Sequence, residues 1–378
     1  MADVLRVGII GAGRAGQCHA TAFSRLSGVE VVAVWNRTRS RSEEFAARFD
    51  QTTGKVYDEW QELIEHGDVD VVSIATVPTL RLAPFAFALR HQKHVLIEKP
   101  LALHVAEARS IAAAAEEAQT VTAICFNWRY SPGCLTLWRA VRDGQIGQPL
   151  DLCTEWRLRS GPLLPTWNVG GAMREVGSHE FDRARFLTRW NFERVVSSLT
   201  TPNYRSKIPA DTSTFVIAQM SDAGHAAFRF TLTPGQPERR VTICGDEGTL
   251  TLSSDWRSVP VDGHLDRVLT LSDETRVIRQ RAEEPDPVEI EIAESDRQPP
   301  GVLSGQHTWN RLVEDFVAAL RANDLRHETV PHLAHVSEGL ASLCVIDACE
   351  RSHAEKRWVD FEAFYKSCTR NSGNPPVG

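Results

Sequence analysis

Three groups of residues in this sequence could take part in chemistry. Gly11-Ala12-Gly13-Arg14-Ala15-Gly16 forms a G-x-G-x-x-G pattern near the start, and Glu98-Lys99-Pro100 follows an apolar run. Further on, Glu175, His179 and Asp182 are spaced i, i+4 and i+7. Glycines in this pattern favour phosphate binding, whereas a lysine and a carboxylate–imidazole pair favour proton transfer.

The glycine pattern predicts a dinucleotide-binding turn, because a strand-like run precedes it and a helix-like stretch begins within it. The first glycine permits the tight turn, the second lets a pyrophosphate approach the backbone, and the third lets the helix pack close to the strand. The free N–H groups and the helix dipole then favour phosphates. A glycine-rich turn that binds no ligand is the alternative.

The position that chooses between NAD and NADP is expected about 20 residues further on. The sequence has Asn36 and Arg37 there, followed by Thr38-Arg39-Ser40-Arg41, with no Asp or Glu. No carboxylate would repel a 2′-phosphate, and Arg37 could bind it, so the sequence favours NADP over NAD. Alternatively, these arginines form the solvated start of a helix.

Lys99 follows the strand-like run His94–Ile97. In an open α/β sheet, ligands bind at the carboxyl ends of the strands. The ammonium of Lys99 could therefore hydrogen-bond a substrate hydroxyl and help to move its proton. A lysine exposed to solvent is the alternative.

Glu175, His179 and Asp182 are expected on one face of a helix, because each step of four or three residues returns to nearly the same direction. A carboxylate one turn from an imidazole can fix its tautomer and raise its basicity, as in a general base. Gly177 inside this helix costs about 1 kcal/mol relative to Ala, which indicates a close approach there. A solvated, charged helix face is the alternative.

The elements that must position these residues divide the chain at residue 124. Residues 1–124 alternate apolar strand-like runs with helix-like stretches, which predicts an α/β Rossmann domain with a doubly wound parallel sheet. The predicted strands are Leu5–Ile10, Val29–Trp35, Val69–Ala75, His94–Ile97 and Thr120–Phe126. The predicted helices are Gly16–Leu26, Arg41–Phe49, Trp60–His66, Leu82–His91 and Ala106–Ala118.

Residues 125–378 are expected to form a substrate-binding and oligomerisation domain of the α+β class, with a mostly antiparallel sheet. The turn-forming segments Ser221–Gly224 and Gly245–Gly248 predict hairpins. The predicted strands are Leu150–Arg159, Arg194–Leu199, Ser213–Met220, Ala226–Leu232, Val241–Cys244, Thr249–Ser253 and Val288–Ile292. The predicted helices are Ala172–Thr188, Thr308–Arg321 and Leu333–Arg351, and Ser372–Gly378 is expected to fray.

Bulk properties exclude several classes of protein. The 378 residues are 42% apolar and carry a net charge of −7 without a dense Lys/Arg stripe, which argues against nucleic-acid and anionic-membrane partners. No apolar run reaches the roughly 18 residues of a membrane helix, and we expect no signal peptide. The eight cysteines form no CxxC pair, so reduced thiols in the cytoplasm and no bound metal are expected.

In this order, the motifs resemble those of the glucose–fructose oxidoreductase / inositol dehydrogenase / MocA (Gfo/Idh/MocA) family. The resemblance runs from about Leu5 to about Phe361 and is more specific than any single motif. Its further members are His19, Asn127-x-Arg129-x-x-Pro132, Gly144-x-Ile146-Gly147, Gly177-x-His179-x-x-Asp182 and Ile243-x-Gly245-x-x-Gly248-Thr249.

The resemblance implies a Rossmann domain followed by an α+β domain whose open sheet often joins subunits, hence a homodimer or homotetramer. It also implies oxidation of sugar or cyclitol hydroxyls, or reduction of the matching ketones, with a nicotinamide cofactor. In the oxidation direction, His179 would accept the hydroxyl proton, Glu175 would orient His179, and Lys99 would hydrogen-bond the same oxygen.

The predicted site consists of catalytic, cofactor-binding and substrate-binding residues. The predicted catalytic residues are Lys99, His179 and Glu175. The predicted cofactor-binding residues are Gly11, Gly13, Arg14, Ala15, Gly16, Asn36, Arg37, Thr76, Glu98 and Lys99. The predicted substrate-binding residues are Lys99, Asn127, Arg129, Arg157, His179 and Asp182. Trp128, Tyr130 and Trp167 are further pocket candidates that could equally belong to the core.

Three residues depart from the family's pattern. Glu175 stands where the family usually has Asp, and Gln92 stands where Gly is common. Arg81 stands where the family commonly has His; it indicates either an acidic substrate or an exposed charge.

Three other functions remain open. The first is an enzyme that recycles a tightly held cofactor to cleave a glycosidic bond. The second is a cofactor-bound regulatory protein without catalysis, and the third is a dinucleotide-dependent reductase of another substrate, such as a linear tetrapyrrole.

Overall fold

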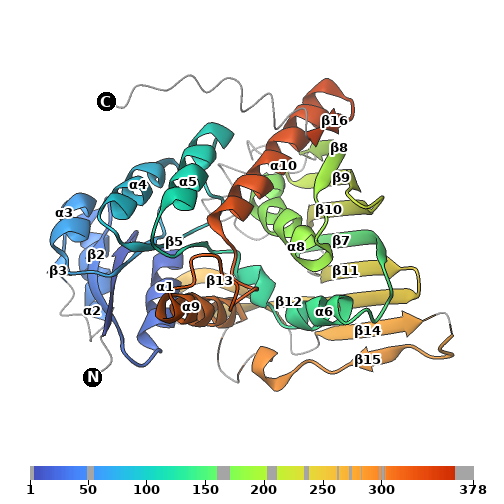
Figure 1. Cartoon of the computed structure of the whole chain (residues 1–378), viewed down its shortest axis with the longest axis horizontal. Coiled ribbons are helices and arrows are strands. Elements are labelled where there is room, and N and C mark those ends of the chain that lie inside the picture. The colour runs from blue at the N-terminus through green and yellow to red at the C-terminus, as the bar shows by residue number, and fades with distance from the viewer. Residues whose placement is uncertain are drawn as a thin grey trace. The chain divides into compact units, whose positions relative to one another are not determined.

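The computed structural model describes residues 4–48, 55–159, 171–201, 211–233, 238–261, 264–271, 275–281, 283–297, 299, 302 and 304–361. The chain divides into two compact units (Figure 1), and each is described by itself. The first unit is Met1–Asn127 with Gln306–Leu343, and the second is Trp128–Gly305 with Cys344–Gly378. The division of labour into a cofactor domain and a substrate domain stays a prediction.

The first unit contains a parallel six-stranded sheet with the order β3-β2-β1-β4-β5-β6. Its strands are β1 (Leu5–Ile10), β2 (Val29–Trp35), β3 (Lys55–Val56), β4 (Val71–Ile74), β5 (His94–Ile97) and β6 (Thr122–Ile124). The strands are apolar because both faces of the sheet are covered, and Ile9, Val71 and Leu96 are completely buried. The order reverses direction between β1 and β4, which is where doubly wound sheets bind ligands. The predicted Rossmann architecture is confirmed.

Helices cover both faces of this sheet. They are α1 (Arg14–Ser24), α2 (Arg39–Arg48), α3 (Trp60–His66), the 3-10 turn η1 (Pro78–Leu80), α4 (Leu82–Arg90), α5 (Val105–Glu117) and α9 (Ser304–Ala322). Figure 1 shows α3, α4 and α5 together on one face. On the other, α9 packs against α1 through the rings of Phe23 and Phe316, whose centroids are 6.3 Å apart.

The second unit is built on a ten-stranded sheet with the order β15-β14-β12-β11-β7-β10-β9-β8-β16, and β13 pairs with β12. Within it, β7 pairs with β10 in parallel and with β11 antiparallel. The predicted hairpins at Ser221–Gly224 and Gly245–Gly248 are confirmed, since they join the antiparallel pairs β9–β10 and β11–β12. The strands are β7 (Pro149–Arg159), β8 (Phe192–Thr200), β9 (Ser213–Met220), β10 (His225–Thr233), β11 (Glu238–Gly245), β12 (Gly248–Val261), β13 (His264–Leu271), β14 (Arg276–Arg281), β15 (Val288–Ile290) and β16 (Val359–Asp360).

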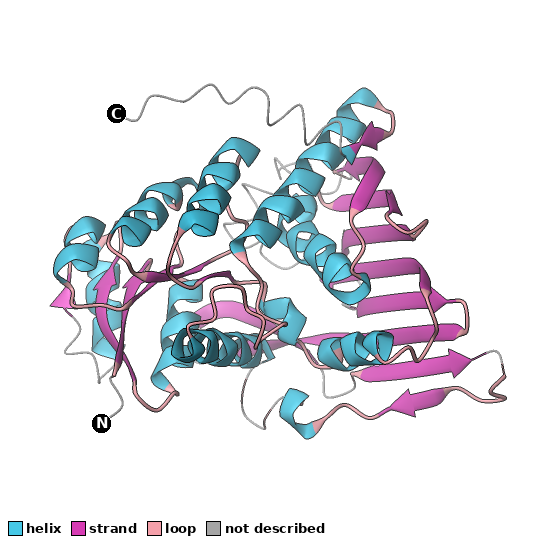
Figure 2. Cartoon of the chain, in the orientation of Figure 1, coloured by secondary structure: helices cyan, strands magenta, loops and turns pink. Residues whose placement is uncertain are grey.

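Helices cover one face of this second sheet: located by their labels in Figure 1, α6, α8 and the C-terminal part of α10 lie beside the same face in Figure 2. On β9, Val216 and Ala218 are buried on that side, whereas Phe215 and Ile217 point the other way and are exposed. The open, mostly antiparallel sheet is therefore confirmed. The helical elements of this part are η2 (Asn127–Tyr130), α6 (Cys134–Arg142), η3 (Met173–Gly177), α8 (Ser178–Thr188), η5 (Glu294–Asp296) and α10 (Val336–Glu355).

Candidate active site

The glycine turn between β1 and α1 leaves space where a pyrophosphate would lie. Gly11 has φ +111°, and a Cβ there would lie 2.8 Å from the carbonyl of Ala75. A Cβ on Gly16 would lie 1.9 Å from the oxygen of Gly11, so this glycine lets the helix approach the strand. A Cβ on Gly13 would meet no atom within 4 Å. The fold therefore requires Gly11 and Gly16, whereas the space at Gly13 fits an approaching dinucleotide.

Asn36 and Arg37 follow β2 beside this turn. The side-chain oxygen of Asn36 accepts a hydrogen bond of 3.2 Å from the Ala12 N–H, and its amide donates to the Thr38 carbonyl at 3.1 Å. Asn36 thus connects the turn after β2 to the glycine turn. Arg37 is exposed, whereas Arg39 is held by Glu43 and Asp58.

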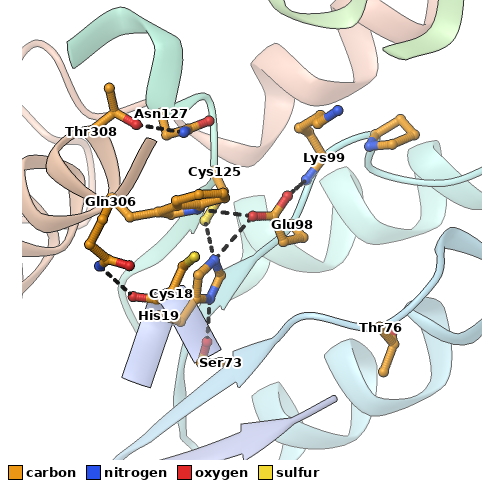
Figure 3. A network of polar contacts seen from close by, with 12 residues as sticks. Cys18, His19, Ser73, Thr76, Glu98, Lys99, Cys125, Asn127, Gln306 and Thr308 are labelled. Carbon is orange, nitrogen blue, oxygen red and sulfur yellow. Dashed lines mark hydrogen bonds and ion pairs between the residues drawn. The ribbon is translucent and has the colours of Figure 1, made fainter. Parts of the chain in front are cut away.

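A buried polar network lies behind the carboxyl end of β5 (Figure 3). Glu98 accepts hydrogen bonds from Nε2 of His19 at 3.1 Å and from the indole of Trp309 at 3.2 Å. Nδ1 of His19 contacts the Ser73 hydroxyl at 2.7 Å, and Nε2 lies 3.4 Å from the Cys125 sulfur. Together these contacts hold Glu98 inside the first unit.

The charge of Glu98 is stabilised within this network. Burial raises the pKa of Glu98, but the hydrogen bond from His19 and the charges of His19, Arg81 and Lys99 outweigh burial and hold the pKa below its ordinary value. The ligand atoms of His19, Glu98 and Cys125 are close enough together to hold a metal ion. Since they already form the polar contacts described above, we interpret the cluster as a hydrogen-bond network.

The backbone of Lys99 is held by this network. The other oxygen of Glu98 accepts the backbone N–H of Lys99 at 3.0 Å, and Figure 3 shows the Lys99 ammonium directed away from that carboxylate. Lys99 is half-buried, as is Thr76, whose hydroxyl donates to the Leu80 carbonyl at 3.3 Å. Both oxygens of Glu98 accept hydrogen bonds from the protein. The expected role of Glu98 as a direct cofactor ligand stays a prediction.

Arg81 differs from both sequence-based alternatives. Only 4% of the residue is exposed, so the interpretation as a surface charge is wrong. Its guanidinium donates to the backbone carbonyls of Thr76, Glu98 and Pro100. Because the guanidinium of Arg81 already donates to these carbonyls, Arg81 gives no reason to infer an acidic substrate.

In the second unit, the helix predicted over Ala172–Thr188 is not a continuous α-helix. A π-helical turn, η3, covers Met173–Gly177 and is followed by α8. Glu175 lies in the π turn and His179 lies in α8, so the α-helical spacing used to place them on one face does not hold across this junction. π turns of this kind are frequent at functional sites.

His179 is part of an aromatic stack. Its ring lies 3.9 Å from the ring centroid of Trp128, with 14° between the planes. Trp128 in turn stacks on Trp156 at 4.4 Å and 9°. His179 is 3% exposed, so the stack and its burial fix the plane of the imidazole. Trp128, a pocket candidate from the sequence, therefore supports His179.

Arg129 and Asp182, both predicted to bind substrate, contact each other. The guanidinium of Arg129 donates two hydrogen bonds of 2.8 and 2.5 Å to the Asp182 carboxylate, and both side chains are buried. A bidentate pair of this kind is strong and directional, so it anchors α8 to the segment that follows Asn127.

The remaining predicted residues lie at different places. Asn127 is buried and donates to the Thr308 hydroxyl at 2.7 Å in the first unit. Arg157 pairs with Glu238 on the sheet face opposite to Thr154, which hydrogen-bonds Glu180 of α8. Because α8 carries His179, the geometry does not support Arg157 as a substrate ligand. Tyr130 is buried core, and Trp167 lies outside the described residues.

None of the helices in the described part of the chain combines the length and the apolar content that crossing a membrane requires.

The glycine turn, the sheet order and the two sets of polar residues define a dinucleotide-binding oxidoreductase, and comparisons with known proteins identify its family. Residues 5–126 match the oxidoreductase family with an NAD-binding Rossmann fold, and residues 134–251 match the GFO/IDH/MocA C-terminal domain. The chain therefore belongs to the Gfo/Idh/MocA family of NAD-binding oxidoreductases.

Relatives agree with this assignment, and solved structures share the fold. The inositol 2-dehydrogenase of Rhizobium meliloti (strain 1021) is 27% identical over 364 residues, which cover 94% of this chain and 98% of that protein. An oxidoreductase from Agrobacterium radiobacter, solved with NAD+, L-tartaric acid and magnesium, has a TM-score of 0.77 at 18% identity and covers 95% of this chain and 99% of its own. A levoglucosan dehydrogenase solved with NADH and L-sorbose has a TM-score of 0.74 at 19% identity over 96% of this chain and 100% of its own.

Proposed function

We propose that this protein is an NAD(P)-dependent dehydrogenase that oxidises a hydroxyl group of a cyclitol or sugar, or reduces the matching ketone. The observation that carries the proposal is the glycine turn, where Gly11 and Gly16 are required by packing and Gly13 faces open space. The substrate class is supported by the relatives named inositol 2-dehydrogenase.

The cofactor, when bound, supplies the hydride acceptor or donor, and the protein supplies orientation and proton transfer. In the oxidation direction, the carbinol carbon loses its hydrogen as hydride and its hydroxyl proton passes to His179. Lys99 hydrogen-bonds the same oxygen and stabilises the negative charge that develops on it. Glu175 is proposed to orient His179, whose ring plane is already set by Trp128.

We assign Arg129 and Asp182 a supporting role in this mechanism. Their bidentate pair is buried and holds α8, the helix that carries His179. Removal of either partner would leave an uncompensated buried charge, which typically costs 3–5 kcal/mol.

The cofactor is proposed to be NADP rather than NAD. No carboxylate follows β2 at the position that would contact the ribose, and the exposed Arg37 is available to a 2′-phosphate. The nearby Arg39 is already held by two carboxylates, so Arg37 is the better candidate.

We also propose a cytoplasmic homodimer or homotetramer. The open face of the second sheet carries exposed apolar side chains, including Phe215 and Ile217. The cysteines of the described residues form no disulfide, which suits a reducing compartment.

The proposed function is tested with the purified protein, NAD or NADP, and a panel of myo-inositol, other cyclitols, sugars and sugar acids. We expect stoichiometric formation of NAD(P)H, measured by its near-ultraviolet absorbance, with at least one cyclitol or sugar. A cofactor-recycling enzyme would form product without net NAD(P)H, and a regulatory protein would bind the cofactor without turnover. A protein that binds neither dinucleotide refutes the proposal.

The roles of the two catalytic residues are tested by substitution. Lys99→Met and His179→Asn should each lower kcat at least ~100-fold, the usual scale for loss of a proton-transfer group. Lys93→Met is the matched control, since Lys93 precedes β5 and has no proposed role. Near wild-type kcat in both active-site variants would contradict the mechanism.

A further inference from the structure

Arg81 joins two loops of the first unit that leave neighbouring parallel strands. It lies between η1 and α4, and its Nε and Nη2 donate to the Thr76 carbonyl at 3.0 and 2.7 Å. Its Nη1 donates to the Glu98 carbonyl at 2.6 Å and also to the Pro100 carbonyl. Thr76 follows β4, and Glu98 follows β5, so one guanidinium connects the carboxyl ends of both strands.

The planar shape of the guanidinium makes this connection possible. One edge, formed by Nε and Nη2, faces the loop after β4, while Nη1 faces the loop after β5. A lysine ammonium is a compact charge and could not present donors in these fixed directions. A charge that is only 4% exposed must be compensated by hydrogen bonds, so Arg81 and the carbonyls hold one another in place.

The two carbonyls on the β5 side belong to the residues immediately before and after Lys99. The backbone N–H of Lys99 is held independently by the Glu98 carboxylate. Arg81 and the Glu98 carboxylate thus both hold the peptide group between Glu98 and Lys99, and Arg81 also holds the carbonyl of the peptide group that follows Pro100. The Cα of Lys99 therefore lies between two restrained peptide groups.

We propose that Arg81 is a positioning residue for Lys99, which acts by fixing the backbone of the Glu98-Lys99-Pro100 turn against the loop at Thr76. The inference rests on the proposed function, because that function gives Lys99 its role. Arg81 itself contacts neither substrate nor cofactor in this proposal. One backbone hydrogen bond, from the Glu98 N–H to the Ile74 carbonyl at 2.9 Å, joins the start of this turn to β4, and the guanidinium extends the connection beyond the ends of the two strands.

The first test needs no substrate. Arg81→Lys keeps the charge and most of the side-chain stem but loses the forked donors. We expect faster amide hydrogen exchange, measured by mass spectrometry, in both residues 76–80 and residues 98–101. The control is Arg90→Lys at the other end of α4, where the arginine is exposed and stacks on Phe87. Unchanged exchange in both loops of Arg81→Lys would overturn the proposal.

The second test separates positioning of Lys99 from general destabilisation by a double-mutant cycle. With whichever compound of the panel the wild type oxidises, Arg81→Lys should lower kcat at least ~10-fold. In the Lys99→Met background it should lower the residual kcat less than ~2-fold, because the group that it positions is gone. Equal losses in both backgrounds would overturn the proposal and assign Arg81 a purely structural role.

The outcomes distinguish this inference from the proposed function. If the wild type oxidises no compound of the panel, the proposed function fails, and hydrogen exchange still decides whether Arg81 holds the loops. If Lys99→Met alone leaves kcat unchanged, the role of Lys99 fails and the inference fails with it. If Lys99→Met lowers kcat but the cycle is additive, only the role of Arg81 fails.

Discussion

At the scale of single residues, the choice of cofactor depends on Asn36 and Arg37. Asn36→Asp keeps the side-chain oxygen that accepts the Ala12 N–H but adds a negative charge beside the ribose position. We expect the ratio of NADP to NAD affinity to fall at least ~10-fold, because the carboxylate repels a 2′-phosphate and accepts the ribose hydroxyls; tenfold corresponds to about 1.4 kcal/mol. Titration of protein fluorescence with NADPH and NADH measures both dissociation constants.

The arginines provide matched controls for this prediction. Arg37→Gln should weaken NADPH binding and leave NADH binding nearly unchanged. Arg39→Gln should change neither, since Arg39 is held by Glu43 and Asp58. If Arg37→Gln leaves NADPH affinity unchanged, another residue binds the 2′-phosphate or the protein prefers NAD.

The role of a residue can be predicted from the sequence when it depends on residues close by in the chain. It is harder to predict when the residue contacts partners that are far away in the sequence. The glycine turn can be predicted because its requirement is local. Three other contacts cannot be predicted in this way: the hydrogen bonds of Arg81 to residues 98 and 100, the pairing of Arg129 with Asp182, and the stacking of Trp128 on His179. Each joins segments about 17 to 53 residues apart, and no local pattern selects the partner.

At the scale of elements, the close contact between β1 and α1 predicts different effects for substitutions of Gly16 and Gly13. Gly16→Ala should lower the melting temperature strongly or prevent folding, because its Cβ would lie 1.9 Å from the Gly11 oxygen. Gly13→Ala should leave the melting temperature within a few degrees but weaken dinucleotide binding at least ~10-fold, because its Cβ enters only the space left for the pyrophosphate. Thermal unfolding with and without NADPH measures both effects.

The pair is informative because each variant controls for the other. Wild-type dinucleotide affinity in Gly13→Ala would show that no phosphate lies at this turn. A stable Gly16→Ala variant would show that α1 can move away from β1 without loss of the fold.

The pairing of β5 with the segment that leads into β6 makes stability depend on pH. Nδ1 of His94 accepts the Val121 N–H at 3.0 Å, and burial holds the pKa of His94 below its ordinary value of 6.5. The neutral imidazole is therefore favoured by folding, and the free energy of unfolding should fall as the pH drops from about 7 through 6.5 to the lowered pKa. The unfolded chain takes up the proton at a higher pH than the folded chain does.

His94→Asn tests this dependence, since the asparagine oxygen can replace Nδ1 as acceptor but does not titrate. Urea denaturation at about pH 7.5 and 5.5 should show a smaller loss of stability in the variant than in the wild type. His335 contributes in the same direction, because burial also lowers its pKa, so part of the loss remains. His66→Asn, at a side chain that is 70% exposed, should behave like the wild type, and an equal response of His94→Asn would refute the assignment.

Elements with a strong local period could be predicted to the residue, among them β1, β2, β5, β9 and α3. The helix α6 and the strands β13 and β14 are missing from the prediction, although the sequence of α6 (Cys134–Arg142) is clearly amphipathic and could have indicated a helix. The π turn η3 is missing because its residues have the same apolar spacing as an ordinary helix. In η3, tertiary contacts rather than local preference decide the backbone.

At the scale of the whole molecule, the first compact unit is not one continuous stretch of the chain. The sequence predicts one boundary at residue 124, whereas the first unit ends at Asn127 and then includes Gln306–Leu343. This later segment supplies α9, which packs on α1, and Ala334, whose carbonyl accepts the Ile124 N–H at the edge of β6. Since a free sheet edge exposes unpaired backbone groups, the returning segment protects the Rossmann sheet at one end.

The open face of the second sheet is the basis for the last prediction. Phe215 and Ile217 lie on β9 with 47% and 54% exposure, and their neighbours Val216 and Ala218 are buried on the opposite face. Exposed apolar side chains in a row on a sheet are typical of an interaction surface. We expect a mass of two or four times 42.1 kDa by size-exclusion chromatography with light scattering, and a shift towards the monomer in Ile217→Lys, because a charge would be buried without a partner. Val4→Lys, at a residue of the first unit that is 42% exposed, should keep the wild-type mass. A monomeric wild type, or an Ile217→Lys variant that stays oligomeric, would remove this face as the contact between subunits.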